Sequence, residues 1–271
     1  MKTDQAAPAG PDVLLSRLRE TAPLVQCITN YVAMNLAANV LLAAGASPAM
    51  VHTEEEAGEF AGIAQALTVN IGTVSPPWVA GMMAAVRGAT AAGRPWVLDP
   101  VAHFATGFRR VVVADLLAQH PAVIRGNASE ILALGGGESA GQGVDSGDPV
   151  ERAEAAAMDL ARTQGAVVAV TGPVDFVTDG SRSARIAGGS ALMPKVTAMG
   201  CSLTGLIGGF VGAAPDAPLD ATVAALAAFA AAGSAAGEAA EGPGSFTPRF
   251  LDALHRLDAA TLDRRAEVTA A

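Results

Sequence analysis

The chain has 271 residues, of which 51% are hydrophobic and 16% are charged, and its formal net charge at pH 7 is −9. This composition excludes a disordered chain and is typical of a compact globular protein with a sizeable core. The negative charge argues against binding to nucleic acid, although a small anionic substrate needs only a local positive site.

Helical and strand-like segments alternate along the chain. Helices are expected where apolar residues recur along one side or a glycine ends the run, at residues 12–21, 35–44, 78–92, 128–134 and 150–164. Strands are expected at short apolar runs, namely residues 66–71, 95–98, 122–125 and 166–170. A tight Asp179-Gly180 turn between residues 176–178 and 182–186 predicts a hairpin. Apolar strands separated by helices indicate one α/β domain with a mostly parallel sheet covered on both faces.

The remaining segments favour a single domain over residues 1–271 that does not cross a membrane. Residues 1–10 lack the apolar run of a signal peptide and are expected to form a flexible leader, and residues 259–271 a frayed polar tail. Residues 221–237 are uncharged but mostly alanine, too short and too weakly apolar for a span, so we expect a buried helix. The Gly/Ser-rich residues 135–147 favour a mobile surface loop over a domain boundary.

Polar residues follow the predicted strands, where open α/β sheets bind their ligands. Asp99 comes directly after the apolar residues 95–98, Arg125 ends residues 122–125, and Thr171 follows residues 166–170. Each position has an ordinary alternative, because Asp99-Pro100 can be a strand-ending turn and Thr171-Gly172 a simple exit from a strand. Together they predict a ligand site at one edge of the sheet.

The segment from Arg125 to Glu130 supports two interpretations. Asn127 and Glu130 have the spacing of a capping box, in which each side chain bonds a backbone N–H of the first helical turn. Alternatively, Glu130 holds a hydrated Mg²⁺ through water while Arg125 contacts a nucleotide phosphate. Both interpretations can hold together.

Cys201 stands behind Gly200 where an apolar helical segment begins. The unpaired N–H groups and the dipole of a helix start favour a bound anion, and they push a thiol in that place toward thiolate. The alternative is a buried cysteine that packs as a small apolar side chain. Cys27 is expected to be structural, and with no metal-ligand or disulfide spacing between the two cysteines a reducing cytoplasm is expected. The four histidines are scattered, and only His52 and His103 fall in loops that could flank a pocket.

These motifs, in this order and spacing, resemble the hydroxyethylthiazole kinase family from about residue 14 to residue 257. The motifs that carry the resemblance are residues 23–32, 45–50, 70–73, 98–101, 125–131, 170–172 and 196–205, together with Asn35 and Asn39. The resemblance implies the ribokinase-like fold, a three-layer α/β/α arrangement around a mostly parallel sheet. It also implies transfer of phosphate from ATP, with Mg²⁺, to the primary alcohol of 4-methyl-5-(2-hydroxyethyl)thiazole in thiamin biosynthesis or salvage.

The resemblance also implies a role for each site residue. Met50 would contact the thiazole with Asn30 near the same pocket, and Ala198 and Gly200 would belong to the anion hole that receives the substrate. The ATP-binding residues would be Arg125, Thr171 and Asn127, the metal-binding residues Asp99 and Glu130, and the catalytic base Cys201. The family forms trimers with active sites at subunit interfaces, so a homotrimer is expected.

Two departures from the family pattern leave alternatives open. The family has glycine where this chain has Ala198, and a Cβ there disfavours a positive φ. Residues 102–104, Ala-His-Phe, replace a glycine-rich stretch after Asp99 and add bulk near the expected site. The alternatives are a ribokinase-fold protein that binds a heterocycle but transfers phosphate weakly, and a kinase for a related hydroxyalkyl heterocycle.

Overall fold

The computed structural model describes residues 9–137 and 147–271. Most of the expected leader (residues 1–10) and of the expected surface loop (residues 135–147) therefore lies outside the described residues.

A nine-stranded sheet forms the middle of the described structure, with the strand order β2-β1-β3-β4-β5-β6-β7-β8-β9. The strands are β1 (Leu24–Ile28), β2 (Ser47–Ala49), β3 (Ala66–Asn70), β4 (Trp96–Asp99), β5 (Val123–Asn127), β6 (Val167–Thr171), β7 (Val174–Thr178), β8 (Ser183–Gly188) and β9 (Ala266–Ala270). All neighbours from β2 to β6 pair in parallel, and β6 to β9 pair antiparallel. The predicted mostly parallel sheet and the predicted hairpin, β7 and β8, are confirmed.

The pairing register brings the polar ends of the parallel strands together. Asn70 of β3 lies opposite Asp99 of β4, and Asn127 of β5 lies opposite Thr171 of β6. Since parallel strands run in one direction, their carboxyl ends meet at a single edge of the sheet, as the sequence predicts for the ligand site.

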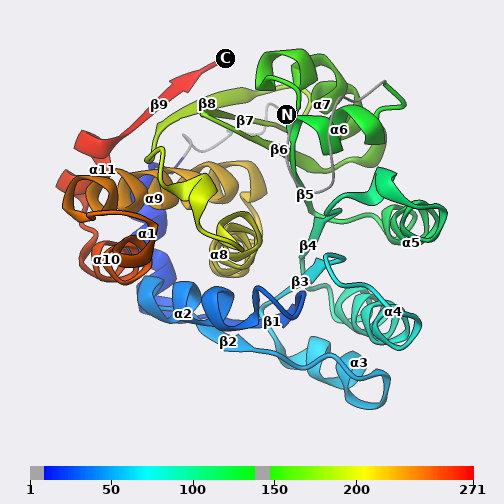
Figure 1. Cartoon of the computed structure of the whole chain (residues 1–271). Helices are drawn as coiled ribbons and strands as arrows, with labels where there is room; N and C mark the ends of the chain where they lie inside the picture. Colours follow the sequence, from blue (N-terminus) through cyan, green and yellow to red (C-terminus); the bar gives the residue numbers. More distant parts are fainter. Residues whose placement is uncertain (1–8, 138–146) are drawn as a thin grey trace, which may run out of the picture.

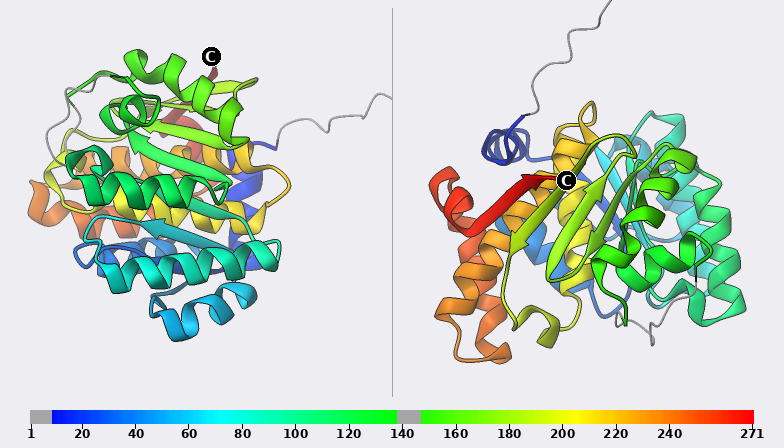
Figure 2. Two further views of the ribbon diagram at one scale, coloured as in Figure 1. Left: turned by 90° about the vertical axis from the view of Figure 1, so that its right-hand side faces the viewer. Right: turned by 90° about the horizontal axis from the view of Figure 1, so that it is seen from above.

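Helices cover both faces of the sheet, which confirms the three-layer arrangement (Figures 1 and 2). On one face lie α3 (Glu54–Ile63), α4 (Pro76–Ala91), α5 (Gly107–Leu117), α6 (Ala128–Leu134) and α7 (Val150–Gln164). The other face carries α1 (Pro11–Thr21), α2 (Met34–Ala44), α8 (Met199–Ala213), α9 (Pro218–Ala239), α10 (Pro243–Arg256) and α11 (Ala259–Arg265). Two short 3₁₀ turns, η1 (His103–Ala105) and η2 (Met193–Lys195), precede α5 and α8.

Small residues let α8 and α9 pack closely into the core. A Cβ at Gly208 of α8 would collide with the side chain of Thr68 in β3, so this glycine allows the helix to lie directly on the sheet. Helix α9 is long and apolar enough to cross a membrane by length and composition, but 78% of its most apolar window is buried inside the protein. Burial of this kind is typical of a core helix, as expected for residues 221–237.

The C-terminal segment differs from the expected frayed tail. Asp258 caps α11 by accepting a hydrogen bond from the backbone N–H of Thr261 at 2.8 Å. Residues 266–270 then form β9, which pairs antiparallel with β8 at the edge of the sheet. The polar composition of this segment suits an edge strand, whose side chains are largely exposed. The composition alone does not reveal the strand, because the pairing with β8 is made by backbone groups.

Candidate active site

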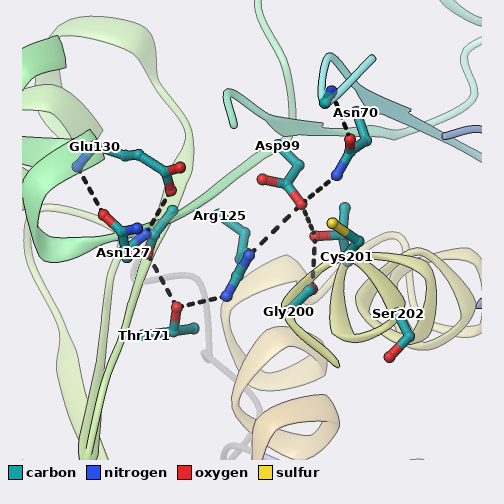
Figure 3. Close-up of polar contacts among 12 residues, drawn as sticks. Asn70, Asp99, Arg125, Asn127, Glu130, Thr171, Gly200, Cys201 and Ser202 are labelled. Atoms are coloured by element: carbon teal, nitrogen blue, oxygen red, sulfur yellow. Dashed lines mark hydrogen bonds and ion pairs between the residues drawn. The ribbon is translucent and has the colours of Figure 1, made fainter. Parts of the chain in front are cut away.

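The site lies at the carboxyl edge of the parallel strands, facing the N-terminal end of α8 (Figure 3). Asp99 from β4, Arg125 from β5 and Thr171 from β6 converge there, as predicted from their positions after the strands. Gly200 and Cys201, in the first turn of α8, complete the cluster from the opposite helix layer.

Asp99 is fully buried, and its two carboxylate oxygens have different surroundings. Oδ2 accepts hydrogen bonds from Asn70 Nδ2 at 2.7 Å and from Thr204 Oγ1 at 2.7 Å, and it lies 3.6 Å from Arg125 Nη1. Within the described residues, Oδ1 is buried and has no hydrogen-bond partner. Burial raises the pKa of Asp99, and the Arg125 charge and the Thr204 and Asn70 hydrogen bonds partly offset that rise.

Arg125 joins the two sides of the cluster. Its Nη2 donates to Thr171 Oγ1 at 2.6 Å, while Nη1 makes the ion pair with Asp99. A Cβ at position 200 would lie 2.7 Å from Nη2 and 2.8 Å from Nη1, so Gly200 is needed for the guanidinium to rest against the start of α8. In the part of the chain that the structure describes, Nε of Arg125 has no partner. The guanidinium therefore keeps hydrogen-bonding capacity for an anion.

Glu130 forms the predicted capping box with Asn127 and is itself buried. Asn127 Oδ1 accepts from the Glu130 N–H at 2.9 Å, and Glu130 Oε2 accepts from the Asn127 N–H at 2.8 Å. Its other oxygen accepts from the Ala102 N–H at 2.9 Å. Burial and, to a smaller extent, the charge of Asp99 raise the pKa of Glu130 to about 7, although the Arg125 charge and the two backbone hydrogen bonds act to lower it. This electrostatic coupling joins the two carboxyl groups in one site.

Cys201 does not have the ionisation that its place at a helix start predicts. Burial, with a further contribution from the Asp99 charge, raises the pKa of its thiol to about 11. This direction is opposite to the shift toward thiolate that a helix start favours, because desolvation and a nearby carboxylate both favour the neutral thiol. Asn30 Nδ2 donates to Sγ at 3.2 Å and to Asn70 Oδ1 at 2.9 Å, which places Asn30 at the centre of the same cluster.

The backbone directly before α8 is in a conformation that favours glycine, although the residue there is Ala198. Ala198 is the N-cap of α8 and has φ 66°, in the left-handed region that a Cβ disfavours. This strained residue lies directly before the first turn of α8. The anion hole expected from Ala198 and Gly200 would be formed at that helix start.

The other expected positions lie outside this hydrogen-bonded cluster. Met50 is half-buried just after β2, and its carbonyl oxygen lies 3.1 Å from His52 Nδ1. His52 in turn stacks on Trp78, with ring centroids 4.2 Å apart. His103 is buried in η1, and burial lowers its pKa to about 4, so its imidazole is neutral at pH 7. Cys27 is buried in β1, in agreement with a structural role.

Asn70 and Thr204 belong to the site, although neither was assigned a role from the sequence. Asn70 ends β3 as Asp99 ends β4, but the strand predicted over residues 66–71 includes Asn70, so the rule that found Asp99 did not single it out. Thr204 stands inside an apolar helix, and no local pattern distinguishes it from a packing residue.

The donor set fits Mg²⁺ that arrives with a nucleotide better than a metal held by the protein alone. No group of three or more His, Cys, Asp or Glu side chains able to hold a metal occurs among residues 9–137 and 147–271. Mg²⁺ is usually bound by one or two carboxylates together with substrate phosphates and water. The two buried carboxyl groups, Asp99 and Glu130, match that requirement, and so does Oδ1 of Asp99, which has no partner among the described residues.

Comparison with known proteins gives matches over nearly the whole chain. The sequence profile described as the hydroxyethylthiazole kinase family matches residues 15–260. A hydroxyethylthiazole kinase of Rhizobium leguminosarum bv. trifolii is 69% identical over 261 residues, covering 96% of this chain and 98% of the relative. One from Cereibacter sphaeroides is 66% identical over 262 residues, covering 97% and 99%.

Solved structures give the same result. The hydroxyethylthiazole kinase protein of Pyrococcus horikoshii superposes with a TM-score of 0.88 at 40% identity, covering 96% of this chain and 98% of that one. A pyridoxal kinase of Staphylococcus aureus, at 17% identity and a TM-score of 0.67, covers 92% and 99% and shares the fold. A ribokinase-like superfamily protein of Enterococcus faecalis does so at 11% identity and a TM-score of 0.63. The chain is thus a kinase of ribokinase-like fold and belongs to the hydroxyethylthiazole kinase family.

Proposed function

We propose that the protein transfers the terminal phosphoryl group of ATP, with Mg²⁺, to the primary alcohol of 4-methyl-5-(2-hydroxyethyl)thiazole. The observation that carries this proposal is the convergence of Asp99, Arg125 and the N-terminus of α8 at one edge of the sheet. Phosphoryl transfer depends mainly on positioning and on neutralising the charge of the moving group, and these are the properties of that arrangement.

The nucleotide side of the site consists of residues from β5 and β6. Arg125 is a permanent cation that is anchored by Thr171 and retains an unpartnered Nε among the described residues. It would hold a nucleotide phosphate, with Thr171 fixing the direction of the guanidinium. Asn127 lies opposite Thr171 in the sheet register and would border the same nucleotide.

The metal side consists of Asp99 and Glu130. Mg²⁺, when bound with the nucleotide, supplies Lewis-acid charge for the phosphates. Asp99 would reach the metal through Oδ1, and Glu130 would hold a metal-bound water through oxygens already fixed by the backbone. The positive charge of the metal would keep both carboxyl groups ionised, against the upward pKa shifts that burial causes.

The acceptor side consists of Asn30, Met50 and Cys201. Met50 would contact the thiazole ring, while Asn30 and the backbone at Ala198 and Gly200 would border the reacting hydroxyl and phosphoryl groups. Because the pKa of Cys201 is about 11, its thiol is neutral at pH 7. Cys201 would therefore contact the hydroxyl as a neutral group and act as a base only to a small extent, which this chemistry tolerates.

The same proposal includes the setting in which the enzyme works. The reaction would serve thiamin biosynthesis or salvage in the cytoplasm, where two free cysteines stay reduced. The proposal also includes a homotrimer with active sites between subunits. Tyr31 and Val32 support it, because these two large apolar side chains are more than half exposed and follow Asn30 of the site directly in the chain. Light scattering of the purified protein would test it, and a monomeric mass would contradict the trimer.

A coupled assay of ADP release tests the proposed reaction. We expect 4-methyl-5-(2-hydroxyethyl)thiazole to give a higher kcat/KM than other hydroxyalkyl heterocycles, and turnover to need both ATP and a divalent cation. Preference for another alcohol would favour a related kinase. Binding of the thiazole without turnover would favour the ligand-binding alternative, for which the strained Ala198 and the buried His103 are the supporting observations.

A further inference from the structure

Asp99 is held from one side only. Both short hydrogen bonds and the ion pair end on Oδ2, whereas Oδ1 has no hydrogen-bond partner among residues 9–137 and 147–271. In Figure 3 this second oxygen points away from Asn70, toward the side on which Glu130 lies. An unpartnered carboxylate oxygen in a buried place is costly unless a cation or another donor meets it.

Asn70 can present only its donor to Asp99. Its Oδ1 accepts from Asn30 Nδ2 at 2.9 Å and from the Gly72 N–H at 2.9 Å. Rotating the amide by half a turn would set the NH₂ group against both of those donors. Nδ2 is thereby directed at Asp99 Oδ2, and the orientation is fixed by Asn30 in the loop after β1 and by Gly72 two residues further along the chain.

Thr204 holds the same oxygen from the opposite layer. Its Oγ1 lies 2.7 Å from Asp99 Oδ2 and 3.4 Å from the Gly200 carbonyl oxygen, so its single proton goes to the carboxylate. Thr204 is surrounded in α8 by buried apolar neighbours such as Leu203 and Ile207. Valine has nearly the same shape, so packing alone does not require the hydroxyl there.

We propose that Asn70 and Thr204 are positioning residues, which hold Oδ2 of Asp99 so that Oδ1 is presented to the divalent cation of the metal–nucleotide complex. This inference rests on the proposed function, because it assigns Asp99 to the metal. It adds two side chains that would touch neither the nucleotide nor the alcohol and would act on the metal through Asp99.

Metal binding measured without the alcohol tests the proposal. Binding of Mn²⁺ in the presence of ADP, followed by the electron paramagnetic resonance signal of free Mn²⁺, should weaken at least about tenfold in Thr204→Val, since a hydrogen bond to a charged group is lost. Thr204→Ser keeps the hydroxyl and should restore binding to within about threefold. Thr222→Val is the matched control, since Thr222 is equally buried in α9 but donates to the Pro218 carbonyl.

Steady-state kinetics separate positioning from general damage. In Thr204→Val the Mg²⁺ concentration for half-maximal turnover should rise while KM for the alcohol stays within about twofold, because the acceptor contacts are unchanged. Thermal unfolding establishes that the variant is folded, and Thr204→Ala provides a second test in the same direction.

Unchanged Mn²⁺ affinity in folded Thr204→Val would overturn the inference, as would a Thr204→Ser variant no better than Thr204→Val. Wild-type protein that binds no Mn²⁺ with ADP would overturn the metal assignment itself, and with it this inference. Wild-type binding together with weakened binding in Thr204→Val would support both.

Discussion

The two carboxyl groups of the site are both buried, but they are held in different ways. Asp99 is fixed by side chains from three elements, namely Asn70, Thr204 and Arg125. Glu130 is fixed by backbone N–H groups of Ala102 and Asn127. The orientation of Asp99 therefore depends on residue identities elsewhere in the chain, whereas that of Glu130 depends on the path of the backbone. Substitutions near the site should affect the first far more than the second.

The largest effect is expected from Glu130→Ala. Loss of the carboxylate should lower kcat by about a thousandfold, comparable with removal of a major electrostatic contact in other enzymes. The variant also loses half of the capping box, so the melting temperature must be measured beside the rate. Glu130→Gln removes the charge but keeps one oxygen that can accept a backbone hydrogen bond. Comparing the two variants therefore distinguishes the loss of charge from the loss of the helix cap. Turnover near the wild-type rate in either variant would remove Glu130 from the metal assignment.

A smaller loss is expected from Asp99→Asn. The amide can keep an oxygen toward Asn70 and Thr204 but carries no charge for the metal, so kcat should fall about a hundredfold. Stability should change little, because the cost of burying the Asp99 charge disappears together with its pairing to Arg125. Equilibrium unfolding in urea measures this. A strongly destabilised Asp99→Asn protein would show that the ion pair supports the fold more than the reaction.

The coupling between the two groups should be visible in the pH dependence of stability without metal. Glu130 has a pKa of about 7 in the folded protein against an ordinary value of 4.5, so its protonation stabilises the folded state. Its contribution to the free energy of unfolding is fully present below about pH 4.5 and is lost as the pH rises to about 7, with a slope of at most about 1.4 kcal/mol per pH unit.

Glu130→Gln should remove this contribution, as a comparison of urea unfolding between pH 4.5 and 8 would show. In Asp99→Asn the loss should be complete at a lower pH, because the Asp99 charge that raises the pKa of Glu130 is gone. Identical pH dependence in the wild type and Glu130→Gln would contradict the raised pKa.

A modest effect is expected from Cys201→Ser. Since the pKa of the thiol is about 11, little thiolate exists at pH 7, and we expect kcat to fall only about two- to fivefold. Alkylation by iodoacetamide should be slow at pH 8 and should accelerate up to the highest pH that the fold tolerates. Rapid modification at pH 7 would show that the thiol ionises near neutrality.

The smallest effect is expected from Ala198→Gly. The substitution relieves a positive φ at the start of α8 but adds freedom to the unfolded chain, for a net gain of about 0.5–1 kcal/mol in the free energy of unfolding. Turnover should stay within about twofold, because both carboxyl groups keep their bonds. A loss of stability would mean that the methyl group of Ala198 packs favourably despite the backbone strain.

The sequence predicted the parallel strands and the polar residues that follow them, because both depend on local patterns. The short apolar runs became β3 to β6, and the rule for open sheets brought Asp99, Arg125 and Thr171 together. β1 received no separate prediction, since the buried Gln26 interrupts its apolar run. The amide NH₂ group of Gln26 donates to the Val51 and Ala57 carbonyl groups, which belong to other segments.

Interactions between distant segments explain the other differences. Thr204 joins the site through a carboxylate 105 positions away in the chain, so its own helix gives no sign of the contact. The ionisation of Cys201 depends on burial and on Asp99, which a helix-start motif does not contain. The C-terminal strand depends on pairing with β8, and its polar residues resemble those of a tail.

The hydrogen bonds from Cys201 to Asp99 form an unbroken chain through Asn30 and Asn70, from the acceptor side of the site to its metal side. An alcohol that accepts a hydrogen bond from the Asn30 side-chain amide would change the hydrogen bond that Asn30 donates to Asn70. Through Asn70 it would also change the hydrogen bond that Asp99 accepts. Binding of the alcohol and binding of the metal–nucleotide complex are then linked, and each must alter the affinity for the other by the same factor. The protein would thus bind its two substrates cooperatively, and the coupling free energy between their sites would depend on Asn30 and Asn70.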